Sequence, residues 1–306
     1  AAIQTEDEIA AVTMALGAAY AGKLGITGSS GPGLALKVEA INLAVMTELP
    51  LIIFDFMRSG ISTGMPTKTE QGDLLMSLYG RPSDSYLIVL APSSAADCFW
   101  ISIEAVRLAT KYMTPVIVLS EGFLVNSSEP WKLPDIDSIP DMKAPYRTDP
   151  KDYLPYKRNK ETLARDWVKI GTHGLEHTIG GLEKTNETGL ITQDPENHDF
   201  MTRVRYEKTQ KVANDIPDIE ILGDKDADLL LVGWGSTLGS MRASMEAVQN
   251  AGKKVALINI RYLNPLPKNL GEILRNYKKV AVVELNLGHL NMIIRSKFMI
   301  DTAFLG

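Results

Sequence analysis

The sequence predicts an α/β fold: a mostly parallel, doubly wound sheet followed by a second, smaller α/β unit. Two observations lead to this class. Apolar runs of strand length alternate with longer amphipathic stretches, a pattern typical of parallel sheets covered by helices. The run 51–56 is almost wholly apolar, as expected for a strand that is buried on both faces. With 306 residues, the chain is also long enough for two domains.

The first half has the more regular pattern. We expect helices at 8–21, 34–47, 70–79 and 96–111, and strands at 24–27, 51–56, 86–90 and 116–119. A glycine-rich turn, 28–33, follows the first strand, and a polar loop, 58–68, follows the second.

The middle of the chain loses this regularity. Residues 125–156 are rich in proline, which predicts an extended connector, and 171–197 read as an excursion before a charged helix at 201–215. A second unit follows, with strands at 228–233, 254–260 and 280–284 and helices at 239–251, 270–276 and from 290 onward. We therefore divide the chain into 1–150, 151–215 and 216–306.

The composition excludes several classes of protein. The net charge of −5 argues against a nucleic-acid-binding or membrane-surface protein. Cys98 is the only cysteine, which excludes a disulfide framework or a four-cysteine cluster within this chain. We interpret Cys98 as a small buried hydrophobe at a helix start. With no visible signal or spanning segment, we expect a cytoplasmic location, and we expect both ends to be fragment boundaries.

The turn Gly28–Gly33 is the first motif that could bind a ligand, because such turns present backbone N–H groups to phosphates. Its glycine order differs from that of dinucleotide-binding turns, although Asp55 lies where a ribose-binding acid would follow. An NAD-dependent dehydrogenase therefore stays an alternative function. In the purely structural alternative, the segment is a tight turn between a strand and a helix.

A second motif is the acidic start of the first helix. Thr5 and Glu8 have capping-box spacing, which would give them a purely structural role. Alternatively, Glu8 is a carboxylate that small apolar neighbours bury, which would raise its proton affinity.

The loop from Arg58 to Asp73 lies beyond the carboxyl end of a buried strand, where open α/β sheets bind ligands. An arginine there can form two hydrogen bonds to a carboxylate, although a solvated arginine is the simpler interpretation. Thr67 and Glu70 also have helix-capping spacing. His173 and His177 have the spacing of metal ligands on a helix, but neighbouring glycines and the absence of cysteine partners argue against a metal site.

These motifs together resemble one family: the alpha subunits of 2-oxoacid:ferredoxin oxidoreductases, most closely the 2-oxoglutarate type. The resemblance covers essentially the whole chain in order and approximate spacing. Its segments are Gln4–Ala11, Thr27–Gly33, Arg58–Asp73, Leu90–Ser93, Asp97–Phe99, Thr114–Ser120, Gly174–His177 and Val283–Gly288, of which the run Ser62–Gln71 is highly specific.

The resemblance implies a thiamine diphosphate-binding fold in residues 1–150, facing the aminopyrimidine ring, and a transketolase C-terminal-like domain at the end. The pyrophosphate and Mg²⁺ would be held by a beta subunit, whose Gly-Asp-Gly motif is absent here. A [4Fe-4S] cluster would lie on a partner, passing electrons to ferredoxin through the beta subunit. Coenzyme A would be the co-substrate, and the assembly a dimer of alpha–beta units.

For individual residues, the resemblance implies that Glu8 binds N1′ of the aminopyrimidine, with Glu6 as runner-up, and that Arg58 and Thr63 bind the substrate. The other cofactor contacts would be Thr27, Gly28 and Ser29. The expected reaction is the reversible oxidative decarboxylation of 2-oxoglutarate to succinyl-CoA. Pyruvate or a branched-chain 2-oxoacid stays open as the substrate, because only Lys68 and Arg81 are candidates to bind the distal carboxylate that 2-oxoglutarate carries.

The chain departs from the family at two places. The upstream Tyr-Pro-Ile-Thr-Pro-Ser-Ser stretch does not occur, and the family's Arg-His-Gly-Asp is Arg81-Pro82-Ser83-Asp84 here. A non-catalytic α/β binding module is therefore an alternative, although such a module would be expected to have lost at least one of Glu8, Arg58 and Thr63.

Overall fold

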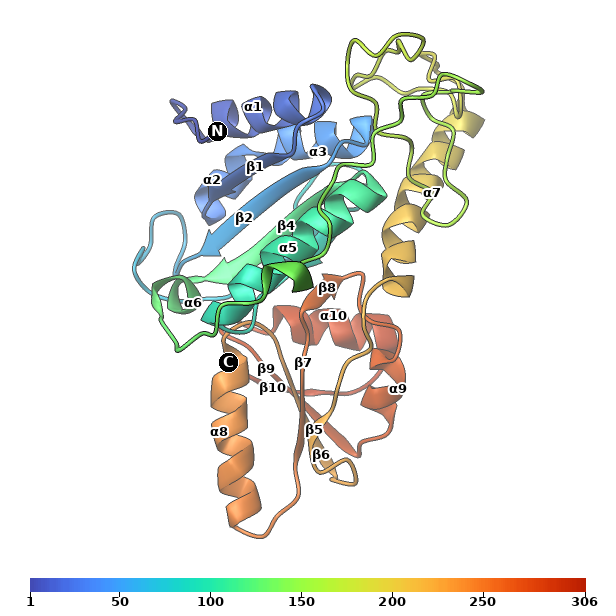
Figure 1. Cartoon of the computed structure of the whole chain (residues 1–306). Coiled ribbons are helices and arrows are strands. Elements are labelled where there is room, and N and C mark those ends of the chain that lie inside the picture. Colours follow the sequence, from blue (N-terminus) through green and yellow to red (C-terminus); the bar gives the residue numbers. More distant parts are fainter.

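The computed structural model describes all of residues 1–306 and contains two five-stranded sheets (Figure 1). The first has the order β1-β2-β4-β3-β8, and the second has the order β10-β9-β6-β7-β5. Every neighbouring pair is parallel except the two that involve β8 and β5. The predicted α/β class with mostly parallel sheets is confirmed.

The elements of the first part are α1 (Glu8–Tyr20), β1 (Gly25–Ser29), α2 (Gly31–Leu36), α3 (Val38–Thr47), β2 (Leu51–Met57), α4 (Leu74–Tyr79), β3 (Ile88–Leu90), α5 (Ala95–Tyr112), β4 (Pro115–Glu121) and α6 (Gly122–Asn126). Those of the remainder are η1 (Ile136–Ser138), α7 (Pro195–Lys211), η2 (Val212–Asn214), β5 (Leu222–Gly223), β6 (Leu229–Gly233), α8 (Thr237–Asn250), β7 (Ala256–Asn259), β8 (Tyr262–Asn264), α9 (Leu270–Arg275), β9 (Lys279–Val283), α10 (His289–Phe298) and β10 (Ala303–Leu305).

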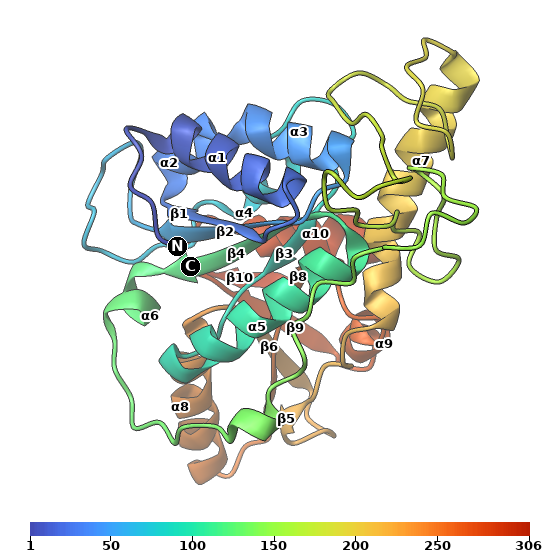
Figure 2. The same ribbon diagram turned by 45° about the horizontal axis from the view of Figure 1, so that its top comes forward.

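Helices cover both faces of the first sheet, with α1 and α3 on one face and α5 on the other (Figure 2). Successive side chains of a strand point to opposite faces, so Ile52 packs towards α5 while Leu51 and Ile53 pack towards α1 and α3. All three are fully buried. This double burial explains why the run 51–56 could be identified from its apolar character.

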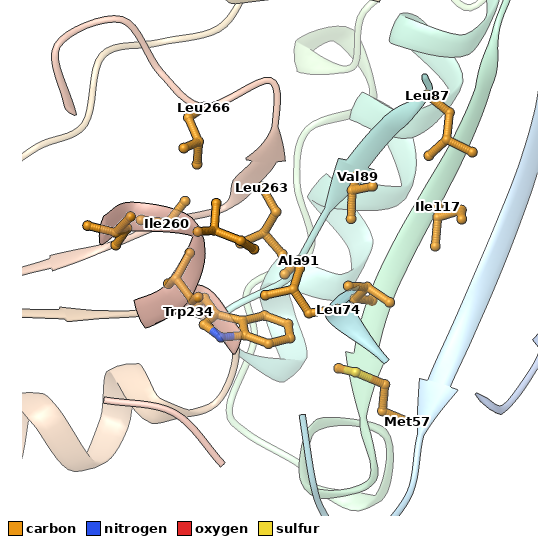
Figure 3. Packing of buried hydrophobic residues seen from close by; sticks show 14 of the residues in the cluster. Met57, Leu74, Leu87, Val89, Ala91, Ile117, Trp234, Ile260, Leu263 and Leu266 are labelled. Carbon is orange, nitrogen blue, oxygen red and sulfur yellow. The ribbon is translucent and has the colours of Figure 1, made fainter. Parts of the chain in front are cut away.

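The two sheets share one apolar core (Figure 3). Trp234, after β6, is fully buried and lies between the two halves, near Leu74 and Ala91 of the first part. The short strand β8 joins the first sheet, where Leu90 pairs with Tyr262. The sequence analysis missed β8, because three residues are too few to show a period of two. The division at residues 150 and 215 stays a prediction.

Three predicted local features are wrong. The helix expected at 34–47 is two helices that meet at the buried Lys37. The helix expected from Glu70 begins at Leu74. The capping box also does not form: Asp7 caps α1 by accepting from the Ala10 N–H at 2.7 Å, while the Thr5 hydroxyl donates to the Asp7 carbonyl. Asp7 is two residues nearer the helix than Thr5, and its carboxylate is the stronger acceptor.

Residues 127–194 contain isolated bridges but no helix longer than η1. A buried charge cluster binds this segment and α7 to the first sheet. Glu48 is fully buried and accepts from Arg158 at 2.7 and 2.9 Å and from the Lys208 ammonium. Burial alone would raise the pKa of Glu48, but the two cations hold it well below its usual value.

Two smaller points complete the fold. Cys98, expected to be buried, is only half-buried in the first turn of α5, where burial still raises the pKa of its thiol. None of the helices combines the length and the apolar character needed to cross a bilayer.

Candidate functional site

The carboxyl ends of β1 and β2 bring the predicted site residues to one edge of the first sheet. The strands are parallel and in register, so that Ser29 pairs with Asp55. Arg58 follows β2 directly, and the start of α1 lies against the turn after β1. Open α/β sheets bind ligands at such an edge, and the structure therefore brings Glu8, Ser29 and Arg58 to a favourable place.

Glu8 is the first residue of α1 and lies half-buried against the glycine-rich turn. A β-carbon at Gly33 would be 2.9 Å from the Cγ of Glu8 and 1.9 Å from the hydroxyl oxygen of Ser29. Only glycine therefore lets the two polar side chains approach α2 so closely. Glu6, the runner-up, is exposed and has no such contact.

The remaining predicted cofactor contacts lie on β1. The side chain of Thr27 is buried, whereas Gly28 is exposed at the sheet edge, where its backbone is accessible. Both residues also line an open groove of about 500 Å³ between residues 1–5, α1 and β1. Glu8 does not line this groove. The predicted tight turn is shorter than expected, because β1 continues to Ser29 and α2 begins at Gly31.

The loop 58–68 is held in one shape by its own hydrogen bonds. Glu70 accepts from the Ser59 hydroxyl at 2.9 Å and from the Gly60 N–H at 2.8 Å, instead of capping a helix. Gly64 has φ of +45°, and a β-carbon there would lie 2.3 Å from the Ser59 carbonyl oxygen. Arg58 is half-buried, with an Nε that has no partner, and Thr63 is exposed on the loop.

Three charged residues, Lys37, Asp55 and Asp73, lie beneath this edge, and Asp73 is only half-buried. Lys37 and Asp55 are fully buried, and neither the Lys37 ammonium nor either Asp55 oxygen has a hydrogen-bond donor or acceptor assigned to it. Burial, and then the neighbouring Asp73 carboxylate, raises the pKa of Asp55 well above its usual value. Burial also raises the pKa of Asp73. Burial lowers the pKa of Lys37. The sequence analysis did not single out Lys37, which lies outside every quoted motif, or Asp73, whose only signal was its place at the end of the segment Arg58–Asp73.

Gln71 fixes the far end of the loop to the second sheet. Its amide donates to Glu121 at 2.6 Å and to the Trp234 carbonyl at 2.9 Å, and its side-chain oxygen accepts from the Leu285 N–H at 2.9 Å. Gly235 makes room for this junction, because a β-carbon there would lie 1.9 Å from a Glu121 oxygen. Sequence reasoning could have found Gln71 only through the specific run Ser62–Gln71.

The structure revises one of the two candidates for a distal carboxylate. Arg81 is buried and uses its guanidinium on the carbonyls of Ser77, Leu78 and Ser85, so the prediction that it binds a substrate carboxylate is wrong. Lys68 stays a candidate, since it is exposed in the loop. No helix contains His173 or His177, which removes the helical spacing that suggested a metal pair.

The chain matches two family models in sequence. Residues 1–196 match the model described as pyruvate flavodoxin/ferredoxin oxidoreductase, thiamine diP-bdg. Residues 227–301 match the model described as pyruvate:ferredoxin oxidoreductase core domain II.

Curated relatives agree with these matches. The 2-oxoglutarate oxidoreductase subunit KorA of Mycobacterium tuberculosis is 51% identical over 299 residues, covering 97% of this chain and 46% of that protein. A 2-oxoacid:ferredoxin oxidoreductase 1 subunit alpha of Aeropyrum pernix is 36% identical, covering 96% of this chain and 47% of that protein. The chain thus spans about half the length of these relatives.

Solved structures extend the comparison to the fold. The 2-oxoglutarate:ferredoxin oxidoreductase from Magnetococcus marinus, with 2-oxoglutarate, coenzyme A and succinyl-CoA bound, superimposes with a TM-score of 0.94 at 35% identity, over 99% of this chain and 53% of that chain. A split-gene transketolase, at 13% identity and a TM-score of 0.51 over 96% of this chain and 70% of that chain, shares the fold alone. The predicted thiamine diphosphate-enzyme type of fold is confirmed. This chain belongs to the pyruvate flavodoxin/ferredoxin oxidoreductase family.

Proposed function

We propose that the chain is the alpha-type part of a thiamine diphosphate-dependent 2-oxoacid:ferredoxin oxidoreductase that acts on 2-oxoglutarate. One observation carries this proposal: Glu8, the glycine-rich turn and Arg58 lie at the same sheet edge. The names of the relatives from Mycobacterium tuberculosis and Magnetococcus marinus support 2-oxoglutarate as the substrate.

The residues present fit one half of a thiamine diphosphate site. The space kept by Gly33 holds the Glu8 side chain against Ser29, on the sheet edge where the Gly28 backbone is exposed, which suits a flat ring with a basic nitrogen. When bound, the cofactor supplies a carbanion-stabilising centre for decarboxylation. The part of the cofactor that carries the pyrophosphate and Mg²⁺ would be held by a beta subunit.

Within this half-site, Glu8 would hold a proton at N1′ of the aminopyrimidine ring. Ser29, packed beside Glu8, and Thr27 and Gly28 would border the ring. Arg58 would donate two hydrogen bonds to the substrate carboxylate, and the Thr63 hydroxyl would add one more. Lys68 would then be the cation available to a distal carboxylate.

Exposed apolar side chains around the same edge support a partner subunit. Ile61 is 95% exposed, Phe123 of α6 is 59% exposed, and Leu287 is 94% exposed. The three segments are neighbours: Gly122 lies against Lys68, and Leu285 bonds to Gln71. Apolar groups gathered near a half-site indicate a surface that another protein covers.

That partner would carry the [4Fe-4S] cluster and pass single electrons to ferredoxin, while coenzyme A accepts the acyl group as succinyl-CoA. In the reverse direction the same site would fix CO₂. A dimer of alpha–beta units and a cytoplasmic location stay predictions.

The test is an assay of the assembled enzyme. We expect 2-oxoglutarate- and coenzyme A-dependent viologen reduction that falls at least about 100-fold in Glu8→Gln, which keeps the size of the side chain but loses its acid–base function. Glu6→Gln is the matched comparison and should stay close to wild type. A loss in Glu6→Gln alone would transfer the role to Glu6, and full activity of both variants would contradict the proposed site.

A further inference from the structure

Both ends of the loop 58–68 meet at one buried glutamate. Glu121 is the last residue of β4 and is fully buried. Its register partner on β2 is Met57, the residue that leads into the loop. Where the loop ends, the Thr69 hydroxyl donates to Oε2 of Glu121 at 3.3 Å, and the Gln71 amide donates to Oε1 at 2.6 Å. The backbone of this glutamate therefore lies beside the start of the loop, and its side chain holds the residues that follow the loop.

The same carboxylate also binds the second sheet. Ser236 lies between β6 and α8, and its N–H donates to Oε1 of Glu121 at 2.8 Å. The Ser236 hydroxyl donates to Oε2. Although Glu121 directly precedes α6, its side chain forms no capping hydrogen bond with that helix. The carboxylate is thus used to join the loop to the second sheet.

The four donors around Glu121 are all uncharged. They are two hydroxyls, one side-chain amide and one backbone N–H. In contrast, the equally buried Glu48 is bonded to the two cations Arg158 and Lys208. A buried carboxylate is costly unless its hydrogen bonds are made, and here each oxygen accepts two. Hydrogen bonds to neutral groups therefore form the connection at this residue.

The internal bonds of the loop 58–68 fix its shape but not its place. The Ser59 N–H donates to the Lys68 carbonyl at 2.9 Å, and Glu70 accepts from Ser59 and Gly60. These bonds would move with the loop if it shifted as a body. Its place relative to the rest of the protein depends on contacts outside it, and the carboxylate described above is central to them.

We propose that Glu121 is a positioning residue for the 2-oxoacid: it fixes the loop 58–68 against the second sheet through hydrogen bonds and not through its charge. This inference rests on the proposed function, because it takes Arg58 and Thr63 of this loop as the groups that bind the substrate. Glu121 acts without touching the substrate, since misplacing a binding group by about 1 Å can lower the rate by about 100-fold.

The first experiment measures the kinetics of the assembled enzyme. In Glu121→Ala we expect KM for the 2-oxoacid to rise about tenfold and kcat to fall by a smaller factor, with KM for coenzyme A unchanged. A purely structural role would reduce the folded fraction, which lowers the apparent kcat and changes neither KM. Glu48→Ala is the matched control: it removes a fully buried glutamate at the opposite edge of the first sheet and should leave both KM values unchanged.

Glu121→Gln tests whether hydrogen bonds or charge carry the role. The new amide oxygen, in place of Oε1, still accepts from Gln71 and from the Ser236 N–H. The amide nitrogen, in place of Oε2, donates to the two hydroxyl oxygens, because a hydroxyl accepts as well as donates. We therefore expect a KM for the 2-oxoacid close to that of wild type. A rise as large as in Glu121→Ala would assign the role to the charge and overturn the inference.

The second experiment measures how firmly the loop is held when no substrate is present. Lys68 is an exposed trypsin site at the end of the loop, and cleavage after it requires local opening. With mass spectrometry we expect faster cleavage there in Glu121→Ala and, to a smaller extent, in Ser236→Ala. Cleavage after the exposed Lys160 of the connector should be unchanged in both. Ser236→Ala removes only one hydroxyl and decides the question if Glu121→Ala does not fold.

The outcomes separate this inference from the proposed function. Faster cleavage after Lys68 with an unchanged KM for the 2-oxoacid would support the anchor and contradict substrate binding by the loop. Unchanged cleavage in folded Glu121→Ala, or in Ser236→Ala if the first variant does not fold, would overturn the inference. In that case the wild-type enzyme could still be active with 2-oxoglutarate, and the proposed function would stand.

Discussion

Two groups of buried charges lie at opposite ends of β2, and they are built in opposite ways. At the amino end, the carboxylate of Glu48 is bonded to both Arg158 and Lys208, and all three are nearly inaccessible. At the carboxyl end, Lys37 and Asp55 are equally buried, yet their charged atoms lack ordinary partners.

The difference separates stability from function along one strand. A buried charge whose hydrogen bonds are complete holds segments together, because breaking it leaves an uncompensated ion. A buried charge with incomplete bonding weakens the fold and persists where chemistry needs it. The amino end joins α7 and the connector to the sheet, whereas the carboxyl end carries the proposed site.

The largest effect is expected from a mutation that breaks the fully bonded cluster of Glu48, Arg158 and Lys208. In Glu48→Ala, Arg158 and Lys208 would stay buried without their counterion, and we expect the free energy of unfolding to fall by about 3–5 kcal/mol. Denaturation by guanidinium, followed by circular dichroism, measures it. Asp226→Ala, which breaks an exposed pair with Lys254, should leave the midpoint unchanged. A loss below about 1 kcal/mol at Glu48 would contradict the comparison.

The second prediction concerns function at the carboxyl end. Arg58→Ala should raise KM for the 2-oxoacid about 100-fold, the equivalent of about 2.7 kcal/mol, because charge-assisted hydrogen bonds to the substrate are lost. The free energy of unfolding should stay as in wild type. The control is Arg203→Ala, which removes an exposed arginine of α7 and should change neither quantity. A lower kcat with unchanged KM would contradict substrate binding by Arg58.

The third prediction tests the junction that fixes the loop. Gln71→Ala leaves the Leu285 N–H without an acceptor and removes one donor each from Glu121 and the Trp234 carbonyl, so we expect a loss of about 2 kcal/mol in the free energy of unfolding. Activity at saturating substrate should also fall, because the loop loses its second attachment. Loss of stability without any change in kinetics would show that the loop keeps its shape by itself.

The smallest expected effect has the opposite sign. Because the pKa of Asp55 is raised, its contribution to stability is present below its usual value of 3.8 and is lost as the pH rises. Asp55→Asn should therefore stabilise the chain at pH 7 by about 1 kcal/mol, and the gain should vanish near pH 3. Glu48 behaves in reverse: its pKa is lowered, so its contribution is present above 4.5 and is lost in acid.

Unfolding free energies between pH 3 and pH 7 for wild type, Asp55→Asn and Glu48→Gln would separate the two behaviours. If Asp55→Asn were less stable than wild type at pH 7, the buried aspartate would be a structural group like Glu48.

The sequence predicted the parts of the molecule with a strong local period. The buried strand β2 and the helix α5 appeared nearly as expected, because long apolar or amphipathic runs fix both their type and their faces. The break at Lys37 could not be predicted, since 34–47 has continuous helical character and no glycine or proline marks the interruption. The pairing of β8 with β3 joins residues far apart in the sequence and leaves no local signal.

The candidate site was predicted by resemblance more than by pattern. Arg58 and Glu8 each had an ordinary structural explanation, and only their shared motifs made them candidates. Arg81 shows the limit of that reasoning, because the sequence cannot show whether a guanidinium is already bonded to backbone carbonyls. Gln71 was quoted only as part of a motif, although its contacts with Glu121 and Leu285 are among the most complete in the chain.

The two attachments of the loop 58–68 also have an evolutionary consequence. β2 fixes one end, Gln71 fixes the other, and Glu70 closes the base, so the exposed residues between contribute little to the free energy of folding. Mutations at Thr63 or Lys68 can accumulate there without a stability penalty. Binding and folding are therefore uncoupled in this loop: its exposed side chains can be selected for their contacts with a ligand alone, because the frame that positions them does not depend on them.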